Sequence, residues 1–110
     1  MNFMDAVKTC FAKYADFTGR ASRSEYWWFV LFEVIVLIVA QLIHQYVYAI
    51  AALGFLLPAL SAGARRLHDI GKSGWFLLLG LIPLVNFYLL FLLVQPSQSD
   101  SNQFGAPPVA

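Results

Sequence analysis

Three long apolar runs, separated by short polar segments, dominate the chain after residue 25. They occupy residues 26–44, 47–64 and 75–94. Each holds about 18–20 residues, or roughly 27–30 Å of α-helix, which matches the hydrocarbon core of a bilayer. Lipid offers no hydrogen-bond partners to backbone groups, so runs of this length have to be helical. The pattern predicts an all-α integral membrane protein with three transmembrane helices.

The third run carries a second interpretation. Gly80, Pro83 and Asn86 interrupt it, and proline inside a helix removes a hydrogen bond and clashes with the preceding turn. The alternative to a third span is therefore a re-entrant hairpin, which would return the C-terminal tail to the side from which the run starts.

Helical spacing of apolar residues also marks the N-terminal segment, residues 1–17. Phe3, Val7, Cys10, Phe11 and Tyr14 fall on one face. This pattern is typical of an amphipathic helix lying in the membrane interface, although packing on a partner protein would use the same face. Residues 18–96 then form the transmembrane domain, and the Pro-, Ser- and Gln-rich residues 97–110 are expected to be a flexible tail.

Composition agrees with a bilayer as part of the solvent. Apolar residues make up 60% of the 110 residues and charged residues 12%, against roughly 45–50% and about 25% in soluble domains. The net charge of +1 does not suggest a nucleic-acid partner. A single cysteine excludes an internal disulfide and a CxxC motif. We expect no metal and no cofactor.

Basic residues fall in two places only. Four precede the first apolar run and three lie between the second and third: Lys8, Lys13, Arg20, Arg23, Arg65, Arg66 and Lys72. The link around residues 44–46 and the tail carry none. The positive-inside rule then places the N-terminus and the loop of residues 65–72 in the cytoplasm, and three spans place the tail outside.

The segment ARRLHDIGKSGW, residues 64–75, resembles a site of chemistry. A phosphate-binding loop needs glycine five residues before its Gly-Lys-Ser, and Arg66 stands there instead. His68 and Asp69 are adjacent and would point about 100° apart on a helix, which disfavours a catalytic arrangement with Ser73. We therefore expect no enzyme, and interpret the segment first as a cytoplasmic turn after the second helix.

A sharper interpretation joins this segment to GRASRSE, residues 19–25. A hairpin of the first two helices would bring both to one leaflet, where five cations face two acids. Unpaired cations at headgroups attract anionic lipid, and arginine can grip phosphate through two hydrogen bonds. The candidate ligand or lipid-headgroup residues are Arg20, Arg23, Glu25, Arg65, Arg66, His68, Asp69 and Lys72.

Two polar residues lie within or at the end of the first run, Glu33 and His44. A carboxylate at the bilayer centre costs roughly 2.5–3.5 kcal/mol, so Glu33 should face other helices. It either hydrogen-bonds between helices in its protonated form or couples transport to protons. The second reading would make the chain a small proton-coupled transporter.

Separated motifs resemble the bacterial inner-membrane family called domain of unknown function 805. The motif residues are Phe17, Gly19, Arg20, Arg23, Glu25, Tyr26 and Trp27, then Arg65, Arg66, Leu67, His68, Asp69, Ser73, Gly74 and Trp75, and finally Asn102, Phe104 and Gly105. The resemblance implies a small multi-pass inner-membrane protein and no established activity.

Together with the pattern of charged and apolar residues, this resemblance favours a non-enzymatic structural, adaptor or anionic-lipid-contacting protein with a basic cytoplasmic surface. The alternative is the transporter centred on Glu33. Three short helices make a thin bundle, so we also expect a homo-oligomer or a membrane-protein partner.

Overall fold

A computed structural model describes residues 2–108 and is helical throughout its ordered elements. The described part of the chain contains no strand beyond one isolated bridge between Asn102 and Gly105. The elements are α1 (Phe3–Ala12), α2 (Arg23–Ile43), α3 (Gln45–Asp69), the 3₁₀ helix η1 (Gly74–Leu81) and α4 (Val85–Leu93).

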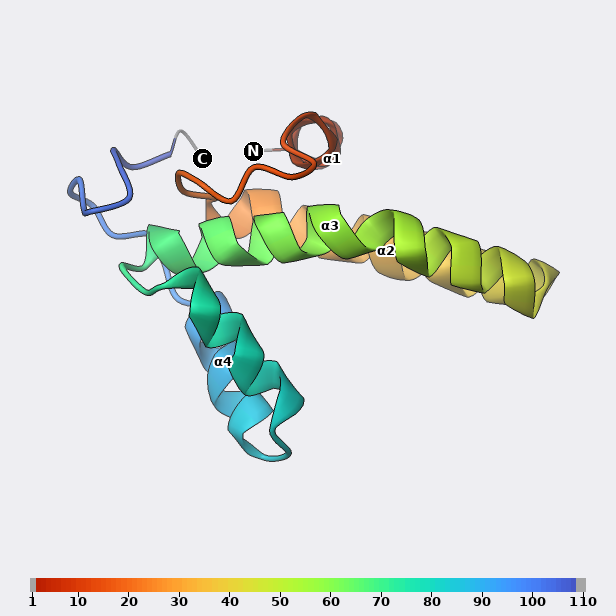
Figure 1. The fold of residues 1–110 in the computed structure, drawn as a ribbon. Helices are drawn as coiled ribbons and strands as arrows, with labels where there is room; N and C mark the ends of the chain where they lie inside the picture. Colours follow the sequence, from red (N-terminus) through yellow and green to blue (C-terminus); the bar gives the residue numbers. More distant parts are fainter. Residues whose placement is uncertain (1, 109–110) are drawn as a thin grey trace.

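The two longest helices, α2 and α3, form an antiparallel hairpin and lie side by side (Figure 1). His44 joins them: its N–H donates to the Ala40 carbonyl, and its Nδ1 accepts from the Tyr46 N–H. With 21 and 25 residues, the helices measure about 31 and 37 Å. Both are long and apolar enough to cross a membrane.

Helix α3 continues further than the sequence suggested. The second apolar run ends at residue 64, yet the helix includes the charged residues up to Asp69. It ends where Gly71 adopts a φ of 80°, a left-handed conformation that glycine reaches without steric cost. Arg65, Arg66, His68 and Asp69 are therefore helical residues, and the turn itself is confined to residues 70–73.

The third apolar run is not one helix. It breaks into η1 and α4 at residues 82–84, around Pro83. Ile82, which precedes the proline, is extended with φ −102° and ψ 119°, as the proline ring favours. Eight residues of 3₁₀ helix and nine of α-helix reach only about 16 and 14 Å. A third transmembrane helix is not confirmed, and the run instead folds back on itself as a short hairpin of η1 and α4.

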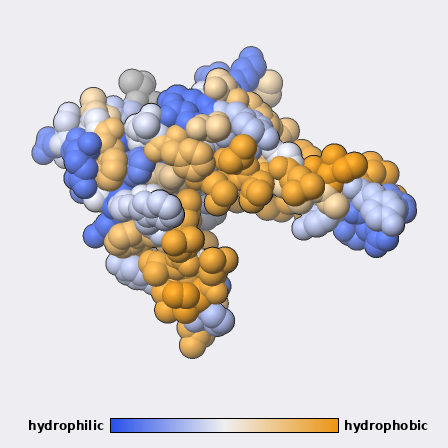
Figure 2. Space-filling model, in the orientation of Figure 1, coloured by the Kyte–Doolittle hydropathy of each residue, from blue (hydrophilic) through white to orange (hydrophobic). Residues whose placement is uncertain are grey.

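The two hairpins diverge from a common corner at the end of α3 (Figure 1). Apolar side chains cover much of both arms, and polar side chains gather around the corner (Figure 2). A core of Leu67 with Leu89, Leu92 and Leu93 joins α4 to the end of α3.

Helix α1 packs on the chain's own α2 and α3. Its Cys10 is fully buried with Phe29 and Phe55, and the Tyr14 hydroxyl donates to the Gly54 carbonyl at 3.0 Å. Edge-to-face or tilted ring contacts tie α1 to its neighbours: Phe3 meets Trp28 and Phe32, and Phe11 meets Phe29, Phe32 and Phe55. Part of the apolar face that we expected to meet lipid or a partner therefore serves the internal core.

A buried arginine network as the candidate functional site

Five charged side chains cluster at the corner where the hairpins meet, and we call them the corner network: Arg20, Glu25, Arg65, Arg66 and Asp69. None is more than 5% exposed. Charged groups are rarely buried to this degree unless they are paired. The partners of each group therefore indicate what the network does.

The turn before α2 supplies Arg20, and the first turn of α2 supplies Glu25. Gly19 has a φ of 81° and allows the chain to reverse. Ser22 then caps α2, and its Oγ accepts from the Glu25 N–H at 3.2 Å. The Ala21 N–H donates to the Arg65 carbonyl at 2.9 Å, which fastens the turn to α3. The Ser-x-x-Glu sequence thus caps the helix, while the Glu25 carboxylate is directed at Arg65.

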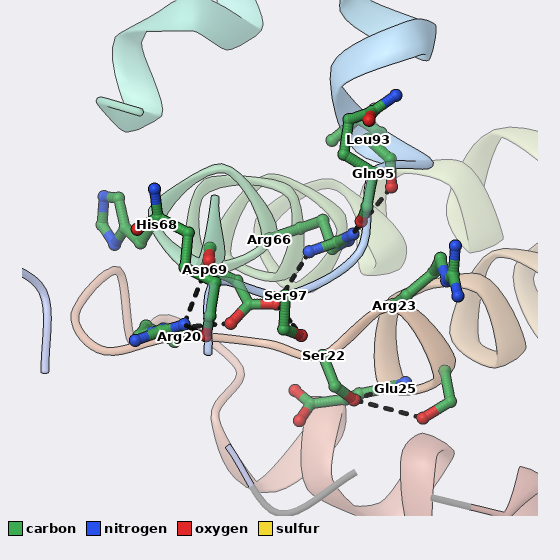
Figure 3. Close-up of polar contacts among 12 residues, drawn as sticks. Arg20, Ser22, Arg23, Glu25, Arg66, His68, Asp69, Leu93, Gln95 and Ser97 are labelled. Carbon is green, nitrogen blue, oxygen red and sulfur yellow. Dashed lines mark hydrogen bonds and ion pairs between the residues drawn. The ribbon is translucent and has the colours of Figure 1, made fainter. Parts of the chain in front are cut away.

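Asp69, the last residue of α3, receives two arginines. Arg20 Nε lies 3.0 Å from its Oδ1, and Arg66 Nη1 lies 2.8 Å from its Oδ2. Figure 3 shows the two guanidinium groups approaching the carboxylate from different segments. The Ser97 hydroxyl also hydrogen-bonds to Oδ2. One carboxylate therefore connects the turn before α2, the end of α3 and the chain after α4.

Arg65 pairs with Glu25 through Nη1, which joins α3 to α2. Its Nε and Nη2 are buried without a hydrogen-bond partner among the described residues. The thiol of Cys10 lies 3.9 Å from a Glu25 oxygen. Burial, followed by the Glu25 charge, raises the pKa of Cys10 to about 11. The thiol is therefore neutral at physiological pH.

The C-terminal tail supplies acceptors that the sequence did not reveal. Arg20 donates to the carbonyls of Gln98 at 2.7 Å, Asp100 at 3.0 Å and Gly105 at 3.1 Å. Arg66 donates to the carbonyl of Leu93 at 3.0 Å and also to that of Gln95. The tail thus lies at the same end as both Arg-rich motifs, which disagrees with its expected position on the opposite side.

His68 borders the network and holds the tail in a second way. Its Nδ1 lies 2.9 Å from the Gly19 carbonyl. Its ring stacks on Phe104 with a centroid separation of 3.9 Å, and Asn102 donates to the His68 carbonyl at 3.0 Å. The tail motif of Asn102, Phe104 and Gly105 was the only sequence signal for these contacts.

The remaining candidate site residues are not part of the corner network. Arg23 and Lys72 are exposed near the corner, and Arg23 donates to the Val94 carbonyl at 3.2 Å. Glu33 is half-buried on α2, and its carboxyl has no hydrogen-bond or ion-pair partner within residues 2–108. His44 is exposed at the far end of the long hairpin.

The geometry of the corner network suits a structural role better than a catalytic one. Three guanidinium groups face carboxylates or backbone carbonyls of the protein itself. Ser73 caps η1, where its Oγ accepts from the Trp75 N–H. No cluster of three His, Cys, Asp or Glu side chains in the described range could hold a metal ion.

Two membrane-length helices, a short apolar hairpin and a buried arginine network define a class of small helical membrane protein. The family model for a protein of unknown function, DUF805, matches residues 14–106, and the chain belongs to this family.

Two relatives from Escherichia coli (strain K12) agree with this class. Inner membrane protein YhaI is 35% identical over 103 residues, covering 86% of this chain and 87% of the relative. Inner membrane protein YhaH is 31% identical over 117 residues, covering 96% and 97%. No solved structure matches the chain. The relatives and the two apolar helices fit a location in the inner membrane.

Proposed function

We propose that this protein is a non-enzymatic scaffold of the inner membrane, in which the corner network clamps two membrane-inserted hairpins at the cytoplasmic headgroups. One observation carries the proposal: three of the four arginines that resembled a ligand site, Arg20, Arg65 and Arg66, are buried, and each pairs with an acid of the chain itself. A ligand-binding or catalytic cluster would instead leave donors accessible in a cleft.

The placement at the cytoplasmic side follows from charge. Every Lys and Arg of the chain lies in α1, directly after it, at the corner or in the adjacent turn, which is the distribution that the positive-inside rule describes. The exposed cations Lys8, Arg23 and Lys72 remain available to anionic headgroups. Lipid contact in this proposal therefore belongs to the rim of the corner, whereas Arg65 and Arg66 hold the fold.

An adaptor role would use the apolar arms, whose exposed side chains suit lipid, a second copy or a membrane-protein partner. We do not put forward proton-coupled transport, because no observation favours it over a structural Glu33. Along α2 the half-buried carboxyl is flanked by apolar residues, and no charged side chain of the corner network pairs with it.

The Asp69→Asn variant tests the clamp. Removing the charge shared by Arg20 and Arg66 leaves buried cations without compensation, at a cost of roughly 3–5 kcal/mol. We expect a large fall in melting temperature in detergent and a lower amount of protein in membranes. The matched control is Asp100→Asn, because the Asp100 side chain is exposed. An Asp69→Asn protein that melts like the wild type would contradict the proposal.

A further inference from the structure

A cavity of about 420 Å³ opens between α3 and η1, on the side of the corner away from the arginines. This volume is within the range of small-molecule sites, roughly 300–1,000 Å³. Its walls are mostly apolar, and they include Leu60, Leu77, Leu78 and the exposed Trp75. His68 and Ser73 are the polar side chains of the lining, and Phe17, Ala64 and Gly74 make up the rest.

The polar and apolar groups of this groove are separated along its length. Leu60, Ala64 and His68 follow one face of α3 at intervals of four residues, so about 12 Å separate the first from the last. His68 and Ser73 lie at the corner end, while Leu60 lies toward the apolar arm. The groove therefore changes from polar to apolar in the direction in which a bilayer does.

The orientation of His68 gives the polar end a defined hydrogen-bonding character. A carbonyl oxygen only accepts, so the contact with Gly19 requires a proton on Nδ1. In the neutral ring Nε2 is then an acceptor. A Cβ built on Gly74 would lie 3.4 Å from Nε2, which places this nitrogen on the η1 side of the ring. Nε2 has no hydrogen-bond partner among residues 2–108, and His68 lines the cavity.

Charge at this end is positive. Lys72 precedes Ser73 directly, is exposed, and forms no ion pair within the described part of the chain. The nearest acid along the chain, Asp69, is already shared by Arg20 and Arg66. A phosphate beside Lys72 would therefore meet an uncompensated cation.

We propose that the groove binds one acyl chain of a phospholipid whose headgroup carries a hydrogen-bond donor. The acyl chain lies along Leu60, Leu77 and Leu78, the phosphate lies beside Lys72, and a headgroup hydroxyl or ammonium donates to His68 Nε2. This inference rests on the proposed function only in placing the corner at the headgroups. Its failure would leave the clamp, which the melting of Asp69→Asn tests, unaffected.

Photo-crosslinking tests the position of the acyl chain. The full-length protein is reconstituted into vesicles that contain phosphatidylglycerol with a photoreactive group in the acyl chain, and the labelled residues are mapped by mass spectrometry. We expect labelling concentrated at residues 60–64 and 77–78. Leu60→Trp should lower it by filling the groove, whereas Leu53→Trp, exposed on the same helix outside the groove, should not. Labels spread evenly along both arms, or unchanged by Leu60→Trp, would overturn the proposal.

Native mass spectrometry of the delipidated protein tests the headgroup. Phosphatidylglycerol, with donor hydroxyls, should be retained better than phosphatidylcholine, which has no donor, and inorganic phosphate should not displace it. Lys72→Gln should weaken retention about fivefold, the value of one interfacial cation, while Lys8→Gln on α1 leaves it unchanged. Equal retention of both lipids, displacement by phosphate, or an inert Lys72→Gln would each overturn the proposal.

Discussion

Arginine is the central residue of the corner, because the same side chain can bind a ligand or join segments of the fold. In this chain the buried arginines join segments of the fold, because acids and backbone carbonyls from distant segments accept their hydrogen bonds. Asp69 alone offers two oxygens to Arg20 and Arg66, and burial makes the loss of either partner costly. Sequence reasoning singled out these charged residues. It could not show which groups the arginine side chains face, because most of the acceptors in the tail are backbone carbonyls, which every sequence contains.

Cys10 provides a test of burial at the corner. Its pKa is raised from the ordinary 9.0 to about 11, first by burial and then by the Glu25 charge. Because the thiolate is the reactive form, we expect slow labelling by a maleimide at pH 8 in the folded protein and rapid labelling after denaturation in detergent. The folded state keeps this proton longer than the unfolded state, so stability should fall between pH 9 and about pH 11. Rapid labelling of folded protein at pH 8 would show that the thiol is not buried.

Gly71 provides a second test, on the turn that ends α3. Its φ of 80° is left-handed, and a Cβ there would lie 2.8 Å from the Gln98 side chain. Gly71→Ala should therefore destabilise the protein by about 1–2 kcal/mol, the cost of a left-handed conformation. Gly54→Ala is the matched control, since its Cβ would meet nothing within 4 Å and the change should stabilise helix α3 by about 0.5–1 kcal/mol. Thermal unfolding measures both, and equal effects would refute the assignment of the turn.

At the scale of elements, hydrophobic length predicted α2 and α3 well and misjudged the third run. All three runs are long enough to cross a bilayer, so length alone cannot distinguish them. The distinction comes from Pro83, which enforces an extended residue before it, and from Leu84, whose φ of 70° reverses the chain. The charged residues also led to an end of α3 that was predicted too early, because arginines mark the membrane interface without ending a helix.

From the hairpin of η1 and α4 we predict that its tip, at residues 82–84, stays inside the membrane. In a Cys10→Ser background, Leu84→Cys at the tip should resist a membrane-impermeant maleimide added from outside the inner membrane. Gln45→Cys in the link between α2 and α3 should react, because it lies at the far end of the long hairpin. Equal labelling of the two cysteines would mean that the third run crosses the bilayer.

For the whole molecule, the network brings together residues 20 to 105, nearly the full length of the chain. Both hairpins leave one corner, and the tail returns to it (Figure 1). The sequence indicated the two Arg-rich motifs as neighbours, and in the structure Arg20 pairs with Asp69 and Glu25 pairs with Arg65. For the tail, the sequence offered only the motif of Asn102, Phe104 and Gly105, because its composition is typical of flexible segments.

The side of the membrane on which the C-terminus lies tests this arrangement most directly. The corner network requires the tail and both Arg-rich motifs on one side, whereas three transmembrane helices would separate them. The measurement is a pair of C-terminal fusions, one to a reporter active only in the cytoplasm and one to a reporter active only outside it. The account predicts activity from the cytoplasmic reporter alone, and activity from the external reporter alone would contradict it.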